Sequence, residues 1–180
     1  MRYLNPGDHS ESNRPTHPSR DQAPSIPPGG QASRSIMAPA LTEVIARAVI
    51  RVDEMLLVAH AHGTNSVFLP GGHVEPGEPV EQALRRELGE ELGVDAELGP
   101  LLGIVEHTYT DDDAVARHEV NLVFDVTVAD ATLASRETHI EIAWIPLADL
   151  EDAKLLPADL RHVIRTPTAT GPVWVPWRPQ

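Results

Sequence analysis

One segment, EPVEQALRRELGEELG over residues 78–93, has the strongest helical pattern of the chain. At about 100° per residue, the turn of an α-helix, three leucines form one apolar stripe: Leu84, Leu88 and Leu92. Beside that stripe, an arc of about 100° carries three carboxylates: Glu87, Glu90 and Glu91. The sequence therefore predicts a helix that is buried along its leucines and that projects its glutamates together.

The crowded glutamates call for a compensating interaction. Like charges three or four residues apart on a helix repel by a few tenths of a kcal/mol per pair. Oxygen ligands on one helix face are what Mg²⁺ or Mn²⁺ prefers. A bare E-x-x-E-E is also typical of a solvated acidic helix face, so the choice rests on the wider pattern. Gly89 points away from these carboxylates, and a glycine there costs about 0.5–1 kcal/mol relative to alanine.

Apolar and β-branched runs on both sides of this helix predict strands, the first two forming a hairpin. The runs cover 43–52, 54–61, 66–72, 101–110, 118–129 and 140–150, and the last of them ends in a short helical turn. A second helix is expected over 157–165, where a proline stands at the helix start. The order β-β-β-α-β-β-β-α predicts an α/β domain in which a mixed sheet has a helix on each side.

The two ends of the chain differ in composition from its middle. Residues 1–40 are rich in Pro, Ser, Gly, Asn and Gln, and such a segment buries too little apolar surface to offset its ordering entropy. We therefore expect a disordered N-terminal tail over 1–40. The C-terminal segment 166–180 is also Pro-rich, and its Trp174 and Trp177 either fold back onto the domain or form a subunit contact.

The balance of charge and the absence of cysteine exclude several classes of function. The chain has 27 acidic and 14 basic residues and a formal net charge of −13, whereas binding to duplex nucleic acid needs a basic surface. Without cysteine it forms neither disulfides nor thiolate metal sites. No apolar run resembles a signal peptide or approaches the ~18–20 residues of a membrane helix. We therefore expect a cytoplasmic protein that binds neither duplex nucleic acid nor membrane.

The spacing around the glutamates is specific. From Gly72 the chain reads G-x5-E-x7-R-E-L-x-E-E-x-G-V, with fixed positions at Gly72, Glu78, Arg86, Glu87, Leu88, Glu90, Glu91, Gly93 and Val94. A chance match is on the order of one in a billion per window, given average residue usage. Every fixed position of the Nudix box is met, so the chain resembles the Nudix hydrolase family. The box covers 72–94, and the compatible order of strands extends the resemblance to about 41–165.

This resemblance implies a fold and a metal site. Family members fold as an α/β/α sandwich with a mixed β-sheet, and the box forms a loop–helix–loop that binds Mg²⁺ or Mn²⁺. On this chain the metal ligands would be Glu87, Glu90, Glu91 and the backbone carbonyl of Gly71. Glu78 and Arg86, together with Gly72, would support the site by orienting the loop and the first metal-binding glutamate.

The resemblance also implies an activity. Family members cleave a diphosphate bond in compounds of the type nucleoside diphosphate linked to X, by attack of a metal-activated water on phosphorus. The catalytic residues would be Glu87, Glu90, Glu91 and Glu141. A general base takes the proton of the water, and we expect Glu87 in that role, with Glu141 as an auxiliary ligand or base and Glu137 as its alternative. A Nudix-fold module that binds a ligand or regulates without turnover is the alternative function.

The substrate is less constrained than the reaction. ADP-ribose hydrolases often carry a proline some way past the box, and Pro100 comes too early for it. Nucleoside triphosphates, nucleoside diphosphate sugars and other small diphosphates therefore all remain open as the small-molecule substrate. Asn121 lies on a run that lines the substrate pocket in many relatives, and it either reads a base or packs within the sheet.

Two further expectations concern histidines and assembly. His60 and His62 alternate on one predicted strand and His73 adjoins the box. We expect these histidines in solvent or beside the substrate rather than in a zinc site. Homodimers are common in the family, and the tryptophan-containing C-terminal segment could serve one.

Overall fold

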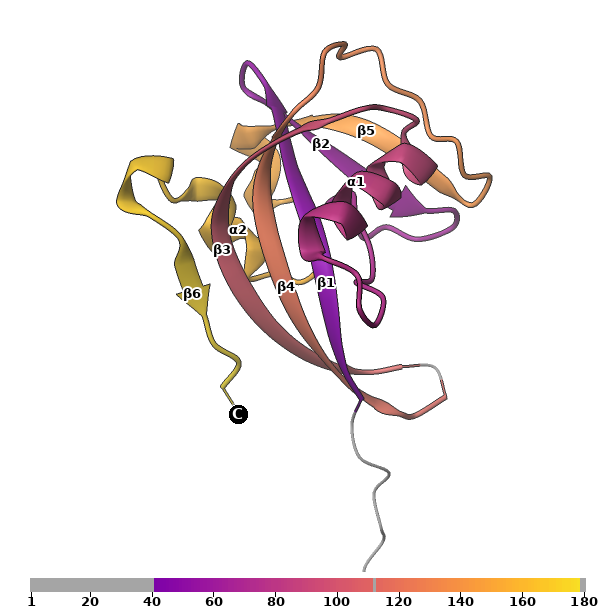
Figure 1. The fold of residues 1–180 in the computed structure, drawn as a ribbon, viewed down its shortest axis with the longest axis vertical. Coiled ribbons are helices and arrows are strands. Elements are labelled where there is room, and N and C mark those ends of the chain that lie inside the picture. The colour runs from indigo at the N-terminus through magenta and orange to yellow at the C-terminus, as the bar shows by residue number, and fades with distance from the viewer. Residues whose placement is uncertain (1–40, 112, 179–180) are drawn as a thin grey trace, which may run out of the picture. The chain divides into compact units, whose positions relative to one another are not determined.

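The computed structural model describes residues 41–178 except 112, and the tail expected over 1–40 lies outside this part of the chain. Within it, six strands form one mixed sheet in the order β5-β2-β1-β4-β3-β6 (Figure 1). The strands are β1 (Leu41–Val52), β2 (Met55–Ala61), β3 (Glu97–Thr110), β4 (Ala116–Thr127), β5 (Ile140–Pro146) and β6 (Val173–Val175). The helices are α1 (Val80–Glu91) and α2 (Leu160–Arg165), with short 3-10 turns at Leu147–Glu151 and Thr168–Thr170. No helix of the described residues is long and apolar enough to cross a membrane.

The central strand β1 has different neighbours along its two sides. It pairs in parallel with β4 along most of its length. Its antiparallel pairing with β2 is confined to the hairpin end, at Arg51 and Val52. β1 and β2 therefore diverge beyond the hairpin, and the sheet is split between them.

The segment 66–74 fills this split. On its β2 side, Phe68 forms an isolated bridge with Ala59. On its β1 side, His73 forms an isolated bridge with Ile45. The chain just before α1 is thus held by both of the strands that it separates.

The predicted strand over 66–72 is therefore wrong, because isolated bridges replace a continuous ladder. Pro70 has no N–H to donate to a neighbouring strand. Gly71 follows it with a φ of 119°, outside the range of a regular strand. An apolar run between strands predicted an extended backbone here, but these two residues break its pairing.

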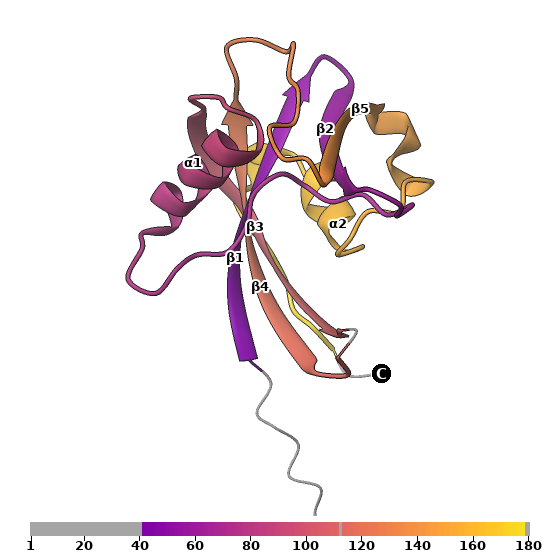
Figure 2. The same cartoon turned by 90° about the vertical axis from the view of Figure 1, so that its right-hand side faces the viewer.

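Alternating side chains of the sheet face two apolar layers, one under each helix. Under α1, the stripe of Leu84, Leu88 and Leu92 packs with sheet residues that include Ala46, Ala48, Ile50 and Leu57. Under α2, the packed side chains include Val49, Leu56, Val58, Leu160 and Val163. Figure 2 shows the two helices on opposite sides of the sheet. The predicted α/β sandwich, with a mixed sheet and a helix on each side, is confirmed.

The ends of α1 lie inside the predicted span of 78–93. Pro79 occupies the N-cap with an extended backbone, at φ −64° and ψ 138°. Gly93 has a φ of 69° just beyond the C-cap residue, a left-handed conformation that ends a helix. The helix therefore begins and ends where the backbone leaves helical geometry.

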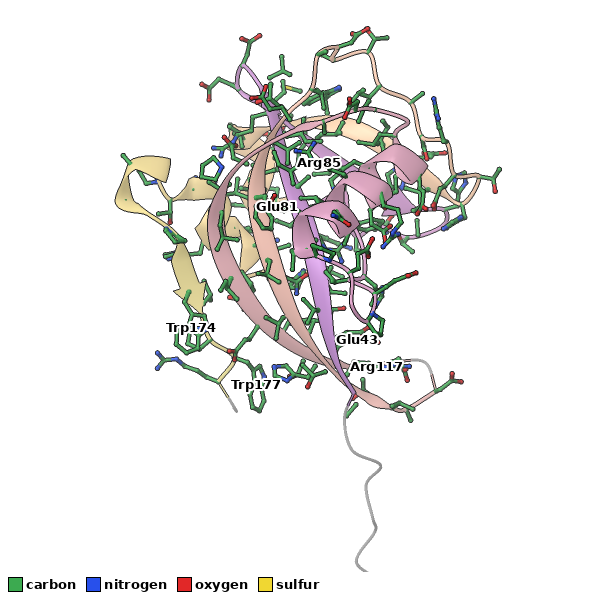
Figure 3. All side chains as sticks on the ribbon, in the orientation of Figure 1. Glu43, Glu81, Arg85, Arg117, Trp174 and Trp177 are labelled. Carbon is green, nitrogen blue, oxygen red and sulfur yellow. The ribbon has the colours of Figure 1, made fainter. Side chains whose placement is uncertain are left out.

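The C-terminal segment folds back onto the sheet. β6 pairs in parallel with β3, and Trp174 lies opposite Ile104. A Cβ at Gly103 would stand 2.6 Å from the carbonyl oxygen of Val173, so the glycine permits this close pairing. A Pro-rich composition hid the short strand from the sequence pattern. Trp174 and Trp177 project from this segment and stay 66% and 46% exposed (Figure 3).

We expect Gly89→Ala to raise the free energy of unfolding of the metal-free protein by about 0.5–1 kcal/mol. Gly89 lies inside α1, and a Cβ added there meets no atom within 4 Å. The added methyl group would therefore reduce the backbone entropy of the unfolded chain without a clash. Urea-induced unfolding of the two proteins, fitted with one m-value, measures the difference.

Gly72→Ala is the matched control for this substitution. A Cβ at Gly72 would stand 2.5 Å from the carboxyl carbon of Glu87, so the Glu87 side chain, which Arg86 contacts, would have to move and no gain in stability is expected. A loss of stability in Gly89→Ala would show that this side of α1 packs more closely than its open surroundings indicate.

Candidate active site

The loop that precedes α1 is fixed to β1 through its backbone. The amides of Ala46 and Ala48 donate to the carbonyls of Gly72 and Pro70, each at 2.9 Å. Between these carbonyls, a Cβ at Gly71 would collide with the carbonyl of Ala46. Glycine is therefore needed at position 71 both for its left-handed backbone and for this close approach.

A carboxylate lies where a side chain at position 72 would begin. Both carboxylate oxygens of Glu87 lie 2.6 Å from the position that a Cβ at Gly72 would occupy. Glu87 is half-buried and comes from the middle of α1. The helix thus brings a carboxylate directly onto the backbone of the loop.

Arg86 connects this loop to α1. Its Nε and Nη2 each donate to the carboxylate of Glu78 at 3.0 Å, and Nη2 also donates to the carbonyl of His73 at 3.0 Å. Its Nη1 donates to Glu87 at 2.8 Å and to Glu90 at 3.2 Å. The hydrogen bond between Arg86 and Glu78 raises the pKa of the guanidinium and lowers the pKa of the carboxyl. Arg86 and Glu78, two of the three residues expected to support the site, thus contact each other and the loop.

Glu91 is the buried carboxylate of the site, with 5% of its surface exposed. Its Oε2 accepts the N–H of Gly71 at 2.9 Å. Burial raises the pKa of Glu91 to about 7, and the charges of Glu87 and Glu137 act in the same direction. The N–H of Gly71 and the charge of Arg47 oppose this rise in the pKa. The ionised form of Glu91 is therefore incompletely stabilised by the protein alone.

No three acidic or histidine side chains converge to enclose a metal ion in the described part of the chain. Nη1 of Arg86 donates to both Glu87 and Glu90, whereas Glu91 accepts the N–H of Gly71, so the three carboxylates have different partners within the protein. The donor set still fits a hard divalent cation, because it consists of oxygen atoms and includes a buried carboxylate with a raised pKa. A cation beside Glu91 would supply the positive charge that this carboxylate lacks.

Glu137 lies close enough to this site to act on it electrostatically. The N–H of the preceding residue, Arg136, donates to the carbonyl of Glu91 at 2.7 Å and holds the segment against the end of α1. The charge of Glu137 is one of the causes that raise the pKa of Glu91. Of the two glutamates considered outside the box, Glu137 is the one whose charge acts on Glu91.

Glu141 lies among histidines instead. In β5 its carboxylate pairs with His60 at 3.2 Å and with His62 at 3.7 Å. The third histidine, His73, lies 3.8 Å from Glu43 at a different place. His60 and His62 thus share Glu141, whereas His73 lies at a different place.

Arg47 is a residue of the site that the sequence pattern did not single out. Its Nη1 donates to the carbonyls of Leu69 at 3.1 Å and Gly71 at 3.0 Å. Its guanidinium carbon lies 5.9 Å from the ring centre of Phe68, within the range of a cation–π contact. Burial lowers the pKa of Arg47, and the charge of Glu119 is the strongest opposing cause. An arginine in the middle of the apolar run EVIARAVIRV, which also carries Arg51 near its end, was the signal that could have found it.

Asn121 packs within the sheet. It is fully buried, its Oδ1 lies 3.4 Å from Nε of Arg47, and its Nδ2 donates to Glu119 at 3.2 Å. Of the two roles left open for this residue, packing within the sheet agrees with these contacts. Asn121 therefore reaches a ligand only through Arg47 or Glu119.

A cavity of about 460 Å³ lies beside Arg47, and we call it the loop cavity. Its wall is mostly apolar or aromatic, with one residue of each charge: Arg47, Phe68, His107, Tyr109, Glu119, Leu156 and Pro157. Such a wall is typical of sites for flat organic rings that carry few polar groups. The cavity thus adjoins the loop that carries Gly71 and shares Arg47 with it.

A family model for the NUDIX domain matches residues 41–166 of this chain. The nucleoside triphosphatase NudI of Escherichia coli O1:K1 is 38% identical over 88 residues, which are 46% of this chain and 62% of that protein. NudI of Enterobacter sp. strain 638 is 34% identical over 93 residues, 48% of this chain and 66% of that protein. The chain thus covers less than two thirds of the length of these curated relatives.

Solved structures match over longer spans. A MutT protein from Methanosarcina mazei Go1 is similar with a TM-score of 0.59 and 25% identity, covering 71% of this chain and 93% of that one. A MutT NUDIX hydrolase from Burkholderia pseudomallei is similar with a TM-score of 0.58 and 30% identity, covering 70% of this chain and 99% of that one. With its box, its sheet and these matches, the chain belongs to the Nudix hydrolase family.

Proposed function

We propose that this chain hydrolyses a diphosphate bond in a nucleoside triphosphate or another nucleoside diphosphate linked to X, with Mg²⁺ or Mn²⁺ as cofactor. The observation that carries this proposal is the buried carboxylate of Glu91, held on the glycine loop within a complete box. The name of the NudI relatives, nucleoside triphosphatase, favours triphosphates as the first class to test.

Each part of the site would have a separate task. The carboxylates of Glu87, Glu90 and Glu91, with the carbonyl of Gly71, would hold the cation. When bound, the cation neutralises phosphate charge and lowers the pKa of the attacking water. Arg47 would keep the carbonyl of Gly71 in position through the hydrogen bond between them. Arg86 would limit the movement of the loop relative to α1.

The remaining tasks are proton transfer and binding of the nucleoside. Glu87 lies against the backbone of Gly72, and we assign it the role of the general base that accepts the proton of the attacking water. Glu137 would be the auxiliary carboxylate, because its charge acts on Glu91. Both glutamates contact histidines, Glu137 through His139 at 3.0 Å and Glu141 through His60 at 3.2 Å, so the effect on Glu91 is what distinguishes them. The loop cavity would take the base, with Phe68 and Tyr109 as aromatic surfaces.

Turnover of a nucleotide panel tests the function directly. With Mg²⁺, we expect the protein to release phosphate or pyrophosphate from a nucleoside triphosphate or to split a nucleoside diphosphate sugar. Glu91→Gln is expected to lower kcat/KM by ~100-fold or more, as for loss of a group that acts in the transition state. Nucleotide binding without turnover by the wild-type protein would instead support the alternative, a non-catalytic module.

Glu137→Gln and Glu141→Gln form a matched pair for the auxiliary carboxylate. We expect Glu137→Gln to lower kcat by ~10-fold or more, because its charge acts next to Glu91. Glu141→Gln should change kcat less than about twofold, with its partners His60 and His62 retained. Steady-state kinetics on one substrate decide between them, and the reverse result would assign the role to Glu141.

The raised pKa of Glu91 predicts a stability difference that depends on pH. Below the unfolded pKa of 4.5, Glu91 is protonated in both states and has no effect on unfolding. Between pH 4.5 and about 7, Glu91 is ionised in the unfolded chain but still protonated in the folded one, so its destabilising effect grows with pH. Above about pH 7 it is ionised in both states, and the effect no longer changes. Above about pH 7, this shift in the pKa of Glu91 lowers the free energy of unfolding by on the order of 3 kcal/mol.

Glu91→Gln should therefore raise the Tm of the metal-free protein by several degrees at pH 8 and leave it nearly unchanged at pH 4. Mg²⁺ should raise the Tm of the wild-type protein at pH 8 and that of the variant much less. Thermal unfolding followed by circular dichroism measures both effects. A Tm that is lower at pH 8 in the variant would mean that the carboxylate already has a sufficient partner within the protein.

A further inference from the structure

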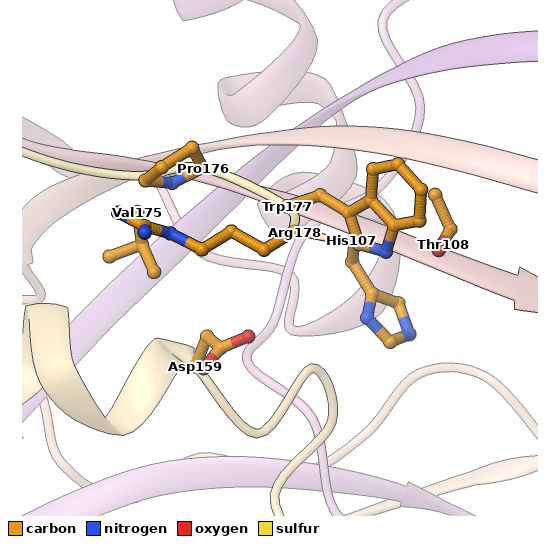
Figure 4. Close-up of a pocket in the computed structure, with 7 residues that line it drawn as sticks. All are labelled: His107, Thr108, Asp159, Val175, Pro176, Trp177 and Arg178. Atoms are coloured by element: carbon orange, nitrogen blue, oxygen red, sulfur yellow. The ribbon is translucent and has the colours of Figure 1, made fainter. Parts of the chain in front are cut away.

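A second cavity lies next to the C-terminal segment, and we call it the tail cavity. Its volume is about 680 Å³. Residues 175–178 form one wall, and His107, Thr108 and Asp159 form the other (Figure 4). The first wall lies beyond residues 41–166, which the family model matches. The cavity is therefore built in part by a segment that is not part of the matched domain.

The wall formed by the C-terminal segment is held by backbone contacts. β6 ends at Val175, which lies opposite Val105 in the parallel pairing with β3. Two residues later, the N–H of Trp177 donates to the carboxylate of Glu106 at 3.2 Å. These contacts fix the backbone on both sides of Pro176, so the sheet places the main chain of Trp177 beside β3.

His107 joins this cavity to the loop cavity, because it lines both. Its ring stacks on Tyr109, with ring centres 5.8 Å apart and planes inclined by 17°. Tyr109 lines the loop cavity, whose Arg47 contacts the carbonyl of Gly71. The two cavities are therefore neighbours along β3, with His107 at the boundary between them.

The side chains of the tail cavity suit a planar ring with nitrogen atoms at its edge. Trp177 and His107 both contribute aromatic rings to the lining of the cavity (Figure 4), and Trp177 is 46% exposed. Bases stack on such rings whatever their identity, since every base has a π-face. Arg178 supplies hydrogen-bond donors and Asp159 supplies acceptors for the edge of the ring.

We propose that the tail cavity is a second base-binding subsite, which takes a planar nitrogen heterocycle in the part of the substrate called X. This inference rests on the proposed function, because it assumes a nucleotide in the loop cavity. The two rings of such a substrate lie on the two sides of the stack formed by His107 and Tyr109. Trp177 is then a specificity-determining residue that favours substrates with two bases.

The kinetic test compares a substrate with two bases, diadenosine tetraphosphate, with one that has a single base, ATP. We expect Trp177→Leu to raise the KM for diadenosine tetraphosphate about tenfold, equivalent to ~1.4 kcal/mol, with kcat changed less than about twofold. The KM for ATP should stay within about twofold of the wild-type value. Trp174→Leu is the matched control, because Trp174 lies in the same segment and does not line the cavity. Equal changes for both substrates, or none for either, would overturn the subsite.

A second measurement needs no turnover. In Trp174→Phe, diadenosine tetraphosphate should protect tryptophan emission from acrylamide quenching, whereas ATP should protect it much less. In Trp177→Phe, which keeps Trp144 and Trp174, this difference between the two compounds should disappear. Protection without hydrolysis would refute the proposed function and keep the subsite. Hydrolysis of diadenosine tetraphosphate without protection of Trp177 would refute the subsite and keep the proposed function.

Discussion

The hydrogen bond from the amide of Gly71 to the carboxylate of Glu91 determines how the site is assembled. It joins the loop to the last turn of α1 in a buried position, where an unpaired amide or carboxylate is costly. The same loop is bound to β1 through Ala46 and Ala48 and to Arg47 through its carbonyls. Helix, loop and central strand thus meet at one residue, and a glycine is needed there because any side chain would separate them.

The pKa values of Glu78 and Glu91 at the site depend on two arginines, Arg86 and Arg47, that lie among several acids. Arg86 contacts Glu78, Glu87 and Glu90, and so stabilises three acids with one guanidinium. Glu91 receives only the more distant charge of Arg47, and burial keeps its pKa raised. The three outer acids thus share a guanidinium, whereas Glu91 has no arginine in direct contact within the described part of the chain. In the proposed function, a divalent cation would supply the missing positive charge to Glu91.

Much of this arrangement could be predicted from the sequence, because periodicity and spacing determine local structure. The leucine stripe predicted which side of α1 is buried, and the Nudix box predicted which acids lie beside the loop that precedes α1. Other features depend on how distant segments meet, which periodicity does not encode. The approach of Glu137 to Glu91 depends on the path of the chain between β4 and β5. The pairing of β6 depends on Gly103 in β3. At Pro70, a strand that the apolar residues favoured does not form.

The split between β1 and β2 has a consequence for the dynamics of the site. A loop on a protein surface usually opens on its own, with a small local free energy of unfolding. Here the loop carries hydrogen bonds to the two strands on either side of it, through Ala59 and Ala46. Its opening therefore breaks hydrogen bonds to both strands, which raises its free energy of local unfolding above that of an unattached surface loop.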